Sequence, residues 1–394
     1  MIKVKKKMFS FEYSFLYAQF LFILFTCFLY QRDGLHYTTA AVSLFCSIFY
    51  WLLYWKGEYL KIPSMGILYI LWGILIAVSS LCGFYFYPYN GYNYLTYYAY
   101  STMWIHSSLM LYVFIKRNPD AFSLVKHFYI LFFIVGVYMN HHTYQLLRNV
   151  IGFDSQYNAF YFVVTPLPFL LLSKKKIHIM LALMFTTLCV VFSLKRSGFI
   201  IVAFLFLWFV VFLLFLDSRM KHRMWRKLLM LLPVCLALYI LIWINGDMVD
   251  YIIRRINHIG VDGGSGRDDL FKYALNLLDR MPFECYIFGN GFGSFHEVTK
   301  SYSSSHNDWL EIMFSYGISG ILLFICMHIL ILRNIFILLR NKSYYLFSYV
   351  AAYFTFGVFN LVSSMIYYQF YSIPLLSYFV IAESFIHKNE IKLK

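Results

Sequence analysis

The chain has 394 residues, of which 61% are hydrophobic, 22% are aromatic and only 13% are charged, and its mean hydropathy is +0.66. A water-soluble core could not hide that much apolar surface, so the composition excludes a soluble globular protein and indicates a polytopic membrane protein. The formal net charge of +15 would suit a nucleic-acid partner, but most basic residues follow the membrane topology described below, so no nucleic acid is expected as a partner.

Apolar runs of about twenty residues recur along the chain, which is the length of helix that crosses ~30 Å of hydrocarbon. The expected spans are 11–30, 36–55, 63–83, 95–115, 127–140, 157–172, 177–193, 198–216, 228–244, 309–332, 344–362 and 371–386. The chain is therefore expected to be all-α, with about twelve transmembrane helices in a single membrane domain, residues 1–394. The histidines His141 and His142 are expected to end the fifth span early, and Pro166 and Pro168 to interrupt the sixth.

The orientation of the spans follows from the lysines and arginines. If the amino terminus is cytoplasmic, most basic residues fall on the cytoplasmic side, as the positive-inside rule requires, and both termini are cytoplasmic. The exceptions lie mainly in one long outer loop, residues 245–308, inserted between the ninth and tenth spans. Cys285 is the one cysteine of this loop, so no disulfide is expected within it.

The outer loop is where the sequence departs from a plain membrane bundle, since it holds nine of the 18 acidic residues of the chain. Its segment 263–268 predicts a turn that runs into a short helix, with Ser265 as the N-cap and Arg267 in the first turn. Apolar residues then recur at helical spacing up to Met281, so this helix is expected to be amphipathic and to lie on the membrane domain.

Two further patterns follow in the loop. The glycines Gly289, Gly291 and Gly293 alternate with other residues, but no strand precedes them and no Lys-Ser/Thr pair follows, so they predict a tight turn rather than a phosphate-binding loop. The run 303–311 then gathers polar and titratable side chains where the loop re-enters the membrane. Ionisable groups at a membrane face of so apolar a chain mark a functional site, and we interpret this run as the edge of an active site.

The order of these motifs resembles that of a known family. His306-Asn307 is followed after nine residues by Gly317-Ile318-Ser319-Gly320, and a basic turn, Ser193-Leu194-Lys195-Arg196-Ser197-Gly198, separates the seventh and eighth spans on the outer face. This pattern, with the twelve-span layout, is similar to the O-antigen polymerase (Wzy-type) and O-antigen ligase superfamily of integral-membrane glycosyltransferases. The resemblance implies a bacterial inner-membrane enzyme that acts at the periplasmic face on a polyprenyl-diphosphate-linked oligosaccharide, within the lipid bilayer.

The resemblance also implies roles for the basic residues. A departing lipid diphosphate needs cations to stabilise its charge, and the planar fork of arginine suits phosphate oxygens. Arg196 and Arg267 are expected to supply that stabilisation, while Lys195, which precedes Arg196, is a second candidate for the same role. Neither a metal nor another cofactor is expected.

His306 is expected either to accept the proton of the acceptor hydroxyl or to donate a third hydrogen bond to the diphosphate. Asn307 and Glu311 are expected to lie at the substrate. Glu311 either orients the imidazole of His306 or simply favours the amino terminus of the tenth span.

Polymerisation of the repeat units is the expected activity, with transfer of the glycan to lipid A-core, the ligase reaction, as the alternative; the resemblance also admits a chain-length regulator as a partner. A lipid-linked glycan flippase or other transporter is the alternative of a different class, and it would place carboxylates or histidines in the middle of the membrane. Glu383 is the clearest acidic residue within a span. The tyrosines of residues 85–100 predict an interfacial belt, or alternatively a surface that stacks on sugar rings.

Overall fold

A computed structural model describes residues 11–29, 35–54, 62–86, 94–150, 158–173, 175–193, 195–213, 263–299, 305–363, 365 and 369–392. The regular structure of these residues is helical throughout. Four of their helices are long and apolar enough to cross a membrane, namely Ser64–Tyr85, Pro119–Leu146, Lys176–Ser193 and Asp308–Arg340, and shorter apolar helices accompany them. The all-helical fold is thus confirmed for these residues, with four candidate membrane spans, while the number of about twelve spans stays a prediction. The expected span 228–244 lies outside the described residues.

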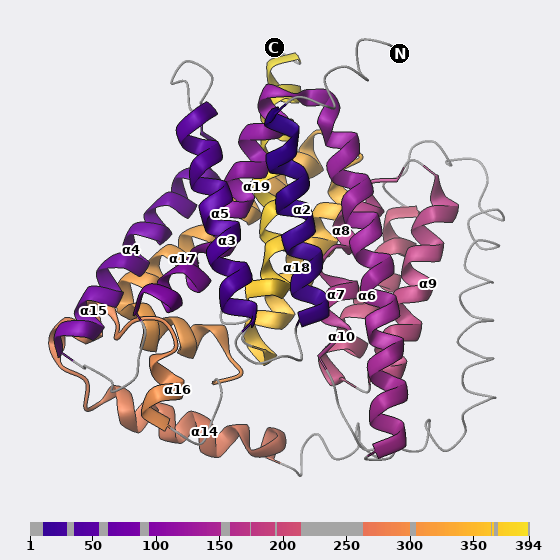
Figure 1. The fold of residues 1–394 in the computed structure, drawn as a ribbon. Helices are drawn as coiled ribbons and strands as arrows, with labels where there is room; N and C mark the ends of the chain where they lie inside the picture. Colours follow the sequence, from indigo (N-terminus) through magenta and orange to yellow (C-terminus); the bar gives the residue numbers. More distant parts are fainter. Residues whose placement is uncertain are drawn as a thin grey trace. The chain divides into compact units, whose positions relative to one another are not determined.

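The helices of the described residues run in chain order from α2 to α19 (Figure 1). They are α2 Phe11–Leu29, α3 Leu35–Tyr54, α4 Ser64–Phe86, α5 Tyr94–Arg117, η2 Pro119–Ala121, α6 Phe122–Val150, α7 Tyr161–Val164, α8 Leu167–Leu171, α9 Lys176–Ser193, α10 Arg196–Val211, α14 Gly263–Leu278, α15 Phe283–Phe288, α16 Ser294–Thr299, α17 Asp308–Arg340, α18 Leu346–Val362 and α19 Gln369–Lys392.

The chain forms two compact units. The first comprises Met1–Phe128, Ala274–Leu338 and Phe359–Lys394, and the second comprises Tyr129–Tyr273 and Leu339–Val358. The expected outer loop is shared between them, because α14 contributes residues to both.

Buried polar side chains hold helices of the first unit together. The amide of Gln19 on α2 donates hydrogen bonds to Ser43 Oγ of α3 at 2.7 Å and to Ser107 Oγ of α5 at 2.6 Å. The hydroxyls of Ser108 on α5 and Ser377 on α19 lie 3.0 Å apart. Small polar residues of this kind let membrane helices approach closely and hydrogen-bond across the contact.

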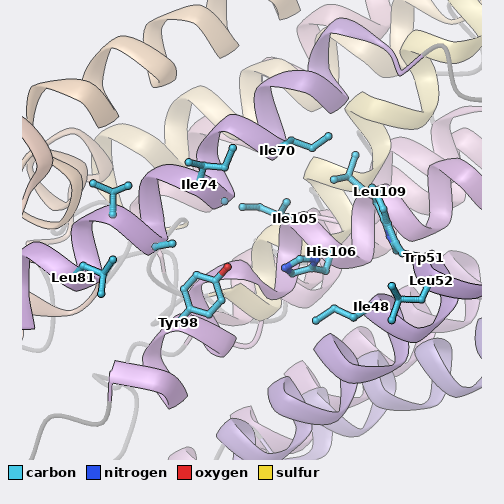
Figure 2. A pocket seen from close by; sticks show the side chains of 13 residues that line it. Ile48, Trp51, Leu52, Ile70, Ile74, Leu81, Tyr98, Ile105, His106 and Leu109 are labelled. Atoms are coloured by element: carbon cyan, nitrogen blue, oxygen red, sulfur yellow. The ribbon is translucent and has the colours of Figure 1, made fainter. Parts of the chain in front are cut away.

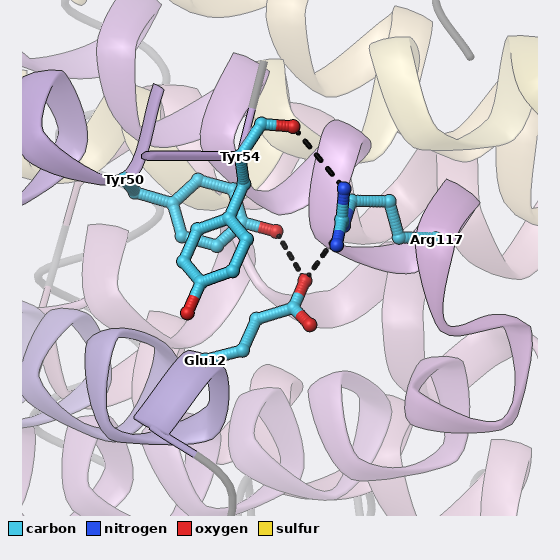
Figure 3. A network of polar contacts seen from close by, with 4 residues as sticks. All are labelled: Glu12, Tyr50, Tyr54 and Arg117. Atoms are coloured by element: carbon cyan, nitrogen blue, oxygen red, sulfur yellow. Dashed lines mark hydrogen bonds and ion pairs between the residues drawn. The ribbon is translucent and has the colours of Figure 1, made fainter. Parts of the chain in front are cut away.

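One end of α2, α3 and α5 is fastened by a charged cluster (Figure 3). Glu12 accepts a charged hydrogen bond from Arg117 Nε at 2.9 Å and a second from the hydroxyl of Tyr50 at 3.0 Å. Arg117 also donates to the backbone carbonyl of Tyr54 at 3.2 Å, and its guanidinium lies over the ring of that residue. The start of α2 therefore lies with the ends of α3 and α5, which is the alternation of helix direction that the sequence predicts.

A second ion pair fastens α4, α17 and α19. Glu383, which is fully buried, accepts hydrogen bonds from Arg333 Nη2 and from the backbone N–H of Met65, both at 2.8 Å. Met65 lies in the first turn of α4, where the unsatisfied N–H groups and the helix dipole favour a carboxylate. The mid-span acid that a transporter would require is thus engaged in a structural contact.

α17 reverses its direction at Gly317. The backbone there is not helical, with φ 62° and ψ −161°, so α17 consists of a short arm, residues 308–316, and a long arm, residues 318–340. Along a straight helix Trp309 and His328 would lie about 28 Å apart at 1.5 Å per residue. Their ring centroids are 5.6 Å apart, and those of Trp309 and Phe324 are 4.8 Å apart. The short arm therefore folds back along the long arm, so the expected span 309–332 is interrupted at Gly317.

The second unit is built around α9 and α10, which contact each other directly. Gly136 of α6 lies so close to α7 that an added Cβ would be 2.6 Å from the carbonyl oxygen of Phe162. The indole of Trp208 on α10 donates to the carbonyl of Phe347 on α18 at 3.2 Å. Phe204 stacks on Phe354 of α18 with ring centroids 3.5 Å apart.

Three local expectations are tested by these helices. The sixth span is interrupted at Pro166, as expected, and forms the short helices α7 and α8. The fifth does not end at His141 and His142, because both lie exposed on the surface of α6, which continues to Val150. Ser265 is not an N-cap, because α14 already begins at Gly263.

Replacing Gly317 by alanine is expected to destabilise the first unit. The backbone conformation of this residue is open essentially to glycine alone, so strain alone should cost about 1–3 kcal/mol. An added Cβ would also lie 2.5 Å from the carbonyl of Ile287. We expect a lower thermal midpoint and a smaller monodisperse fraction in detergent for Gly317→Ala.

The matched control is Gly357→Ala in α18, where an added Cβ would meet no atom within 4 Å. Alanine is a better helix former than glycine, so this variant should be neutral or slightly more stable. Equal behaviour of the two variants would contradict the reversal at Gly317.

Candidate functional site

The loop-to-helix junction, residues 305–311, begins the short arm of α17. Asn307 is the N-cap of this helix, because its Oδ1 accepts hydrogen bonds from the backbone N–H of Trp309 at 2.9 Å and of Leu310 at 3.2 Å. Its side-chain amide also donates to the carbonyl of Leu361 at 3.4 Å, so Asn307 ties the junction to the end of α18. Asn307, which the sequence predicts to bind substrate, thus caps the short arm and connects it to α18.

Glu311 and Ser305 form a buried contact in the same junction. Glu311 Oε2 accepts both the backbone N–H of Ser305 at 3.0 Å and its hydroxyl at 2.9 Å. Ser305 is fully buried and Glu311 is 3% exposed. Glu311 Oε1 has no hydrogen-bond partner among the described residues, so the hydrogen bonds of this carboxylate go to Ser305 rather than to the imidazole of His306.

His306 lies between these two fixed neighbours. Its side chain is exposed, and its backbone has a φ of 52°, in the left-handed region. Few residues other than glycine adopt this region, and such outliers gather at functional sites when the surroundings hold them there. An exposed imidazole on a fixed backbone is suited to proton transfer or to hydrogen bonding with a ligand.

The alternating glycines engage the reversal of α17. The backbone N–H groups of Asn290 and Gly291 donate to the carbonyls of Phe314 and Ser315, both at 3.0 Å. These two carbonyls belong to the last turn of the short arm, where helical hydrogen bonds end. Gly289, with a φ of 78°, lies so close to Ser315 that a side chain would collide with its backbone. The expected tight turn therefore also caps the short arm.

The glycine turn is packed against α4 and α5 as well. Gly83 of α4 lies directly against the carbonyl of Asn290, so no side chain could be placed there. The ring of Phe292 lies 6.0 Å from that of Tyr97 and 5.6 Å from that of Tyr100. At least these two tyrosines of the aromatic stretch therefore serve to hold the turn in place.

The basic turn belongs to the second unit and joins α9 to α10. Arg196 is the first residue of α10, and Lys195, in extended conformation, occupies the N-cap position. Gly198 lets the start of α10 lie close to α9, because an added Cβ there would be 2.8 Å from the side chain of Val190. Arg196 is half-buried and lies at a helix amino terminus, where unpaired N–H groups and the helix dipole attract anions.

Arg267 lies in the first half of α14 and also belongs to the second unit. Further along α14, Leu270 and Ala274 are buried while Leu275 is exposed, as expected of an amphipathic helix. The junction with His306 belongs to the first unit. The structure thus brings Ser305, Asn307 and Glu311 together in the first unit. Arg196 and Arg267 belong to the second unit.

Two histidines near the junction were not predicted from the sequence to be functional residues. His296 of α16 interacts electrostatically with Glu311. His328 of the long arm lies parallel to the indole of Trp309 and 3.5 Å from the side-chain amide of Asn360. No spacing rule could have found His328, because it is brought there by the reversal of α17. Among the described residues no group of His, Cys, Asp and Glu side chains could hold a metal ion.

A crevice of about 630 Å³ lies between α3, α4 and α5 (Figure 2). Its wall is mainly aliphatic, and the imidazole of His106 and the hydroxyl of Tyr98 are its few polar groups. Such a lining suits hydrocarbon and offers no cation for a phosphate. The crevice is therefore not a candidate for the diphosphate or sugar chemistry.

Comparison with known proteins identifies one relationship. Residues 179–325 match a family model described as O-antigen ligase. The match supports the O-antigen polymerase and ligase superfamily that the motifs predict. It contains Lys195, Arg196, Arg267, His306, Asn307 and Glu311. No curated protein matches the chain.

The thiol of Cys285 is expected to report on the glycine turn, because the carbonyl of this residue accepts the N–H of Gly289 at 2.7 Å. Burial, with smaller contributions from Cys82 and Glu284, raises the pKa of Cys285 to about 11. Below that pH the thiol stays protonated and unreactive, so maleimide labelling at pH 7.5 should be negligible and should rise as the pH approaches 11.

Peptide mapping by mass spectrometry measures this labelling, with Cys285→Ser to assign the signal and detergent-denatured protein as the fully reactive reference. Labelling of the native protein at pH 7.5 as fast as that of the denatured protein would contradict the buried position of Cys285.

Proposed function

We propose that the protein is an O-antigen polymerase that joins polyprenyl-diphosphate-linked oligosaccharide units at the periplasmic face of the bacterial inner membrane. The family match over residues 179–325 carries the broader part of this proposal, a polymerase or ligase of O-antigen units, because it spans the basic turn, α14 and the junction with His306. In the proposed reaction the growing glycan leaves its lipid diphosphate, and its reducing-end sugar is joined to a hydroxyl of the next lipid-linked unit.

The proposed roles follow from the chemistry of the residues. Arg196 and Arg267 stabilise the charge of the departing diphosphate; preorganised charge stabilisation is often the largest catalytic contribution. The position of Arg196 at the amino terminus of α10 supports its role, since the helix dipole adds to the positive potential. Lys195 provides a second positive charge beside it.

His306 acts on the acceptor hydroxyl as a general base, or it donates a hydrogen bond to the diphosphate. Its exposed side chain and left-handed backbone support a position open to substrate. A general base must be within hydrogen-bond reach of the proton that it accepts. The exposed imidazole of His306 can meet this condition, whereas a buried imidazole could not.

The second candidate function is ligation of the glycan to lipid A-core, which uses the same donor. The description of the matching family favours it. The choice of polymerase rests on the overall resemblance and on the Phe- and Tyr-rich composition, with 43 Phe and 36 Tyr residues in the chain. The flippase alternative has no comparable support. Glu383, the acidic residue within a span that a transporter could use, is engaged in an ion pair with Arg333.

Deletion of the gene is expected to leave lipopolysaccharide with at most one repeat unit on the core, because a separate ligase still transfers single units. Gel electrophoresis of extracted lipopolysaccharide measures this, with a plasmid copy of the intact gene as the control. Bare core together with accumulated lipid-linked polymer would favour the ligase, and an unaltered long ladder would contradict both enzymes.

Arg196→Ala and Arg267→Ala are each expected to lower turnover by about 10²–10³-fold, the loss typical of one preorganised charge-stabilising donor. The lysine variants should recover little, because an ammonium cannot make the planar paired contact. Turnover of lipid-linked units is measured on purified protein in liposomes, and the control is Arg280→Ala, an exposed arginine of the same loop. Near-normal turnover of both alanine variants would rule out the diphosphate role.

A further inference from the structure

The backbone of His306 needs an external constraint. A histidine with a φ of 52° is strained relative to the ordinary helical and extended conformations. Since its side chain is exposed, packing of the imidazole into a core does not supply the constraint. The residues on either side of it, Ser305 and Asn307, are each held by hydrogen bonds.

The following residue is fixed by its capping hydrogen bonds. Asn307 Oδ1 binds two N–H groups of the short arm, and its amide binds the carbonyl of Leu361. These contacts hold the residue after His306 and satisfy the helix terminus without help from Glu311. Helix capping is consequently insufficient to explain why a carboxylate is buried at position 311.

The preceding residue is fixed by Glu311 itself. The N–H of Ser305 donates to Glu311 Oε2 at 3.0 Å, and its hydroxyl lies 2.9 Å from the same oxygen and 2.8 Å from the carbonyl oxygen of Asn307. An acidic residue in the first turn of a helix usually gains its small benefit from the dipole while it stays in water. Here the carboxylate is 3% exposed, and Oε1 lacks a hydrogen-bond partner among the described residues. Burial of such a group is unfavourable for stability, which points to a different reason for its presence.

We propose that Glu311, acting through Ser305, is a positioning residue that holds His306 in its left-handed backbone conformation and so aims the imidazole at the substrate. The inference rests on the proposed function of His306. Glu311 touches neither substrate nor imidazole in this role. It holds Ser305, the residue before His306, as the capping contacts hold Asn307, the residue after it.

The first test measures kcat and KM on purified protein in liposomes. Glu311→Ala should lower kcat about 10-fold or more and leave the KM for the lipid-linked donor within about twofold, because binding groups elsewhere are intact. Glu311→Gln should recover most of the loss, because its amide oxygen can still accept from Ser305. The control, Glu12→Ala, removes another helix-start carboxylate of the same unit and should lower the thermal midpoint without changing kcat per folded molecule.

A double-mutant cycle separates positioning from a general structural effect. If Glu311 acts through His306, then Glu311→Ala should cause no further loss of kcat in a His306→Ala background. An equal loss in both backgrounds, or full kcat of Glu311→Ala, would overturn the inference. If His306→Ala is fully active, the proposed function of His306 fails instead.

A measurement independent of activity completes the test. In a His306→Cys protein, the rate of labelling by a membrane-impermeant maleimide reports the exposure of this position. Addition of Glu311→Ala should change that rate at least threefold, whereas addition of Glu12→Ala should leave it unchanged. The same rate in all three proteins would overturn the inference even if the enzyme assays show a loss.

Discussion

The reversal of α17 at Gly317 is the constraint on which the rest of the first unit depends. A helix that turns back on itself leaves the last carbonyls of its short arm without helical partners, and in an apolar environment such groups are costly. The N–H groups of Asn290 and Gly291 supply those partners at 3.0 Å. The glycine turn and the break in α17 are therefore one structural device, although 26 residues separate Gly291 from Gly317 in the sequence.

The same reversal decides where the polar groups of the junction lie. Because the short arm folds back, Trp309 lies against Phe324 and His328 of the long arm. A straight helix would have carried His306 well away from these residues. The carboxylates Glu12 of α2 and Glu383 of α19 behave differently, since each pairs with an arginine. Those ion pairs fasten helices, whereas the exposed His306 at the junction remains suited to chemistry.

Much of this architecture follows from the sequence because apolar length is a strong signal. The expected span 11–30 agrees with Phe11–Leu29, and 36–55 agrees with Leu35–Tyr54. The turn before Arg196 was predictable from its basic residues, and the order of the motifs predicts the superfamily supported by the match over residues 179–325. In each case the helix, turn or motif is determined by residues that are close together in the sequence.

Features that depend on distant contacts were not predictable. Gly317 and Gly357 both lie in apolar helical runs, yet only the first has a non-helical backbone, because only there does a second chain segment supply the missing hydrogen bonds. For the same reason the sequence pattern indicates Glu311 as a dipole partner or as a contact of the imidazole. Its actual partner, Ser305, is reached because His306 adopts a left-handed turn.

The buried carboxylate and the strained histidine are best understood together. Each is unfavourable for stability when considered alone, and a sequence under selection for stability alone would retain neither. Charge stabilisation and proton transfer, however, are effective only when the reacting groups are fixed before the substrate arrives, because reorganisation would otherwise consume the gain. A junction in which the residues on both sides of the histidine are held by hydrogen bonds meets that requirement, and it does so on a short helical arm that is itself fixed by the glycine turn.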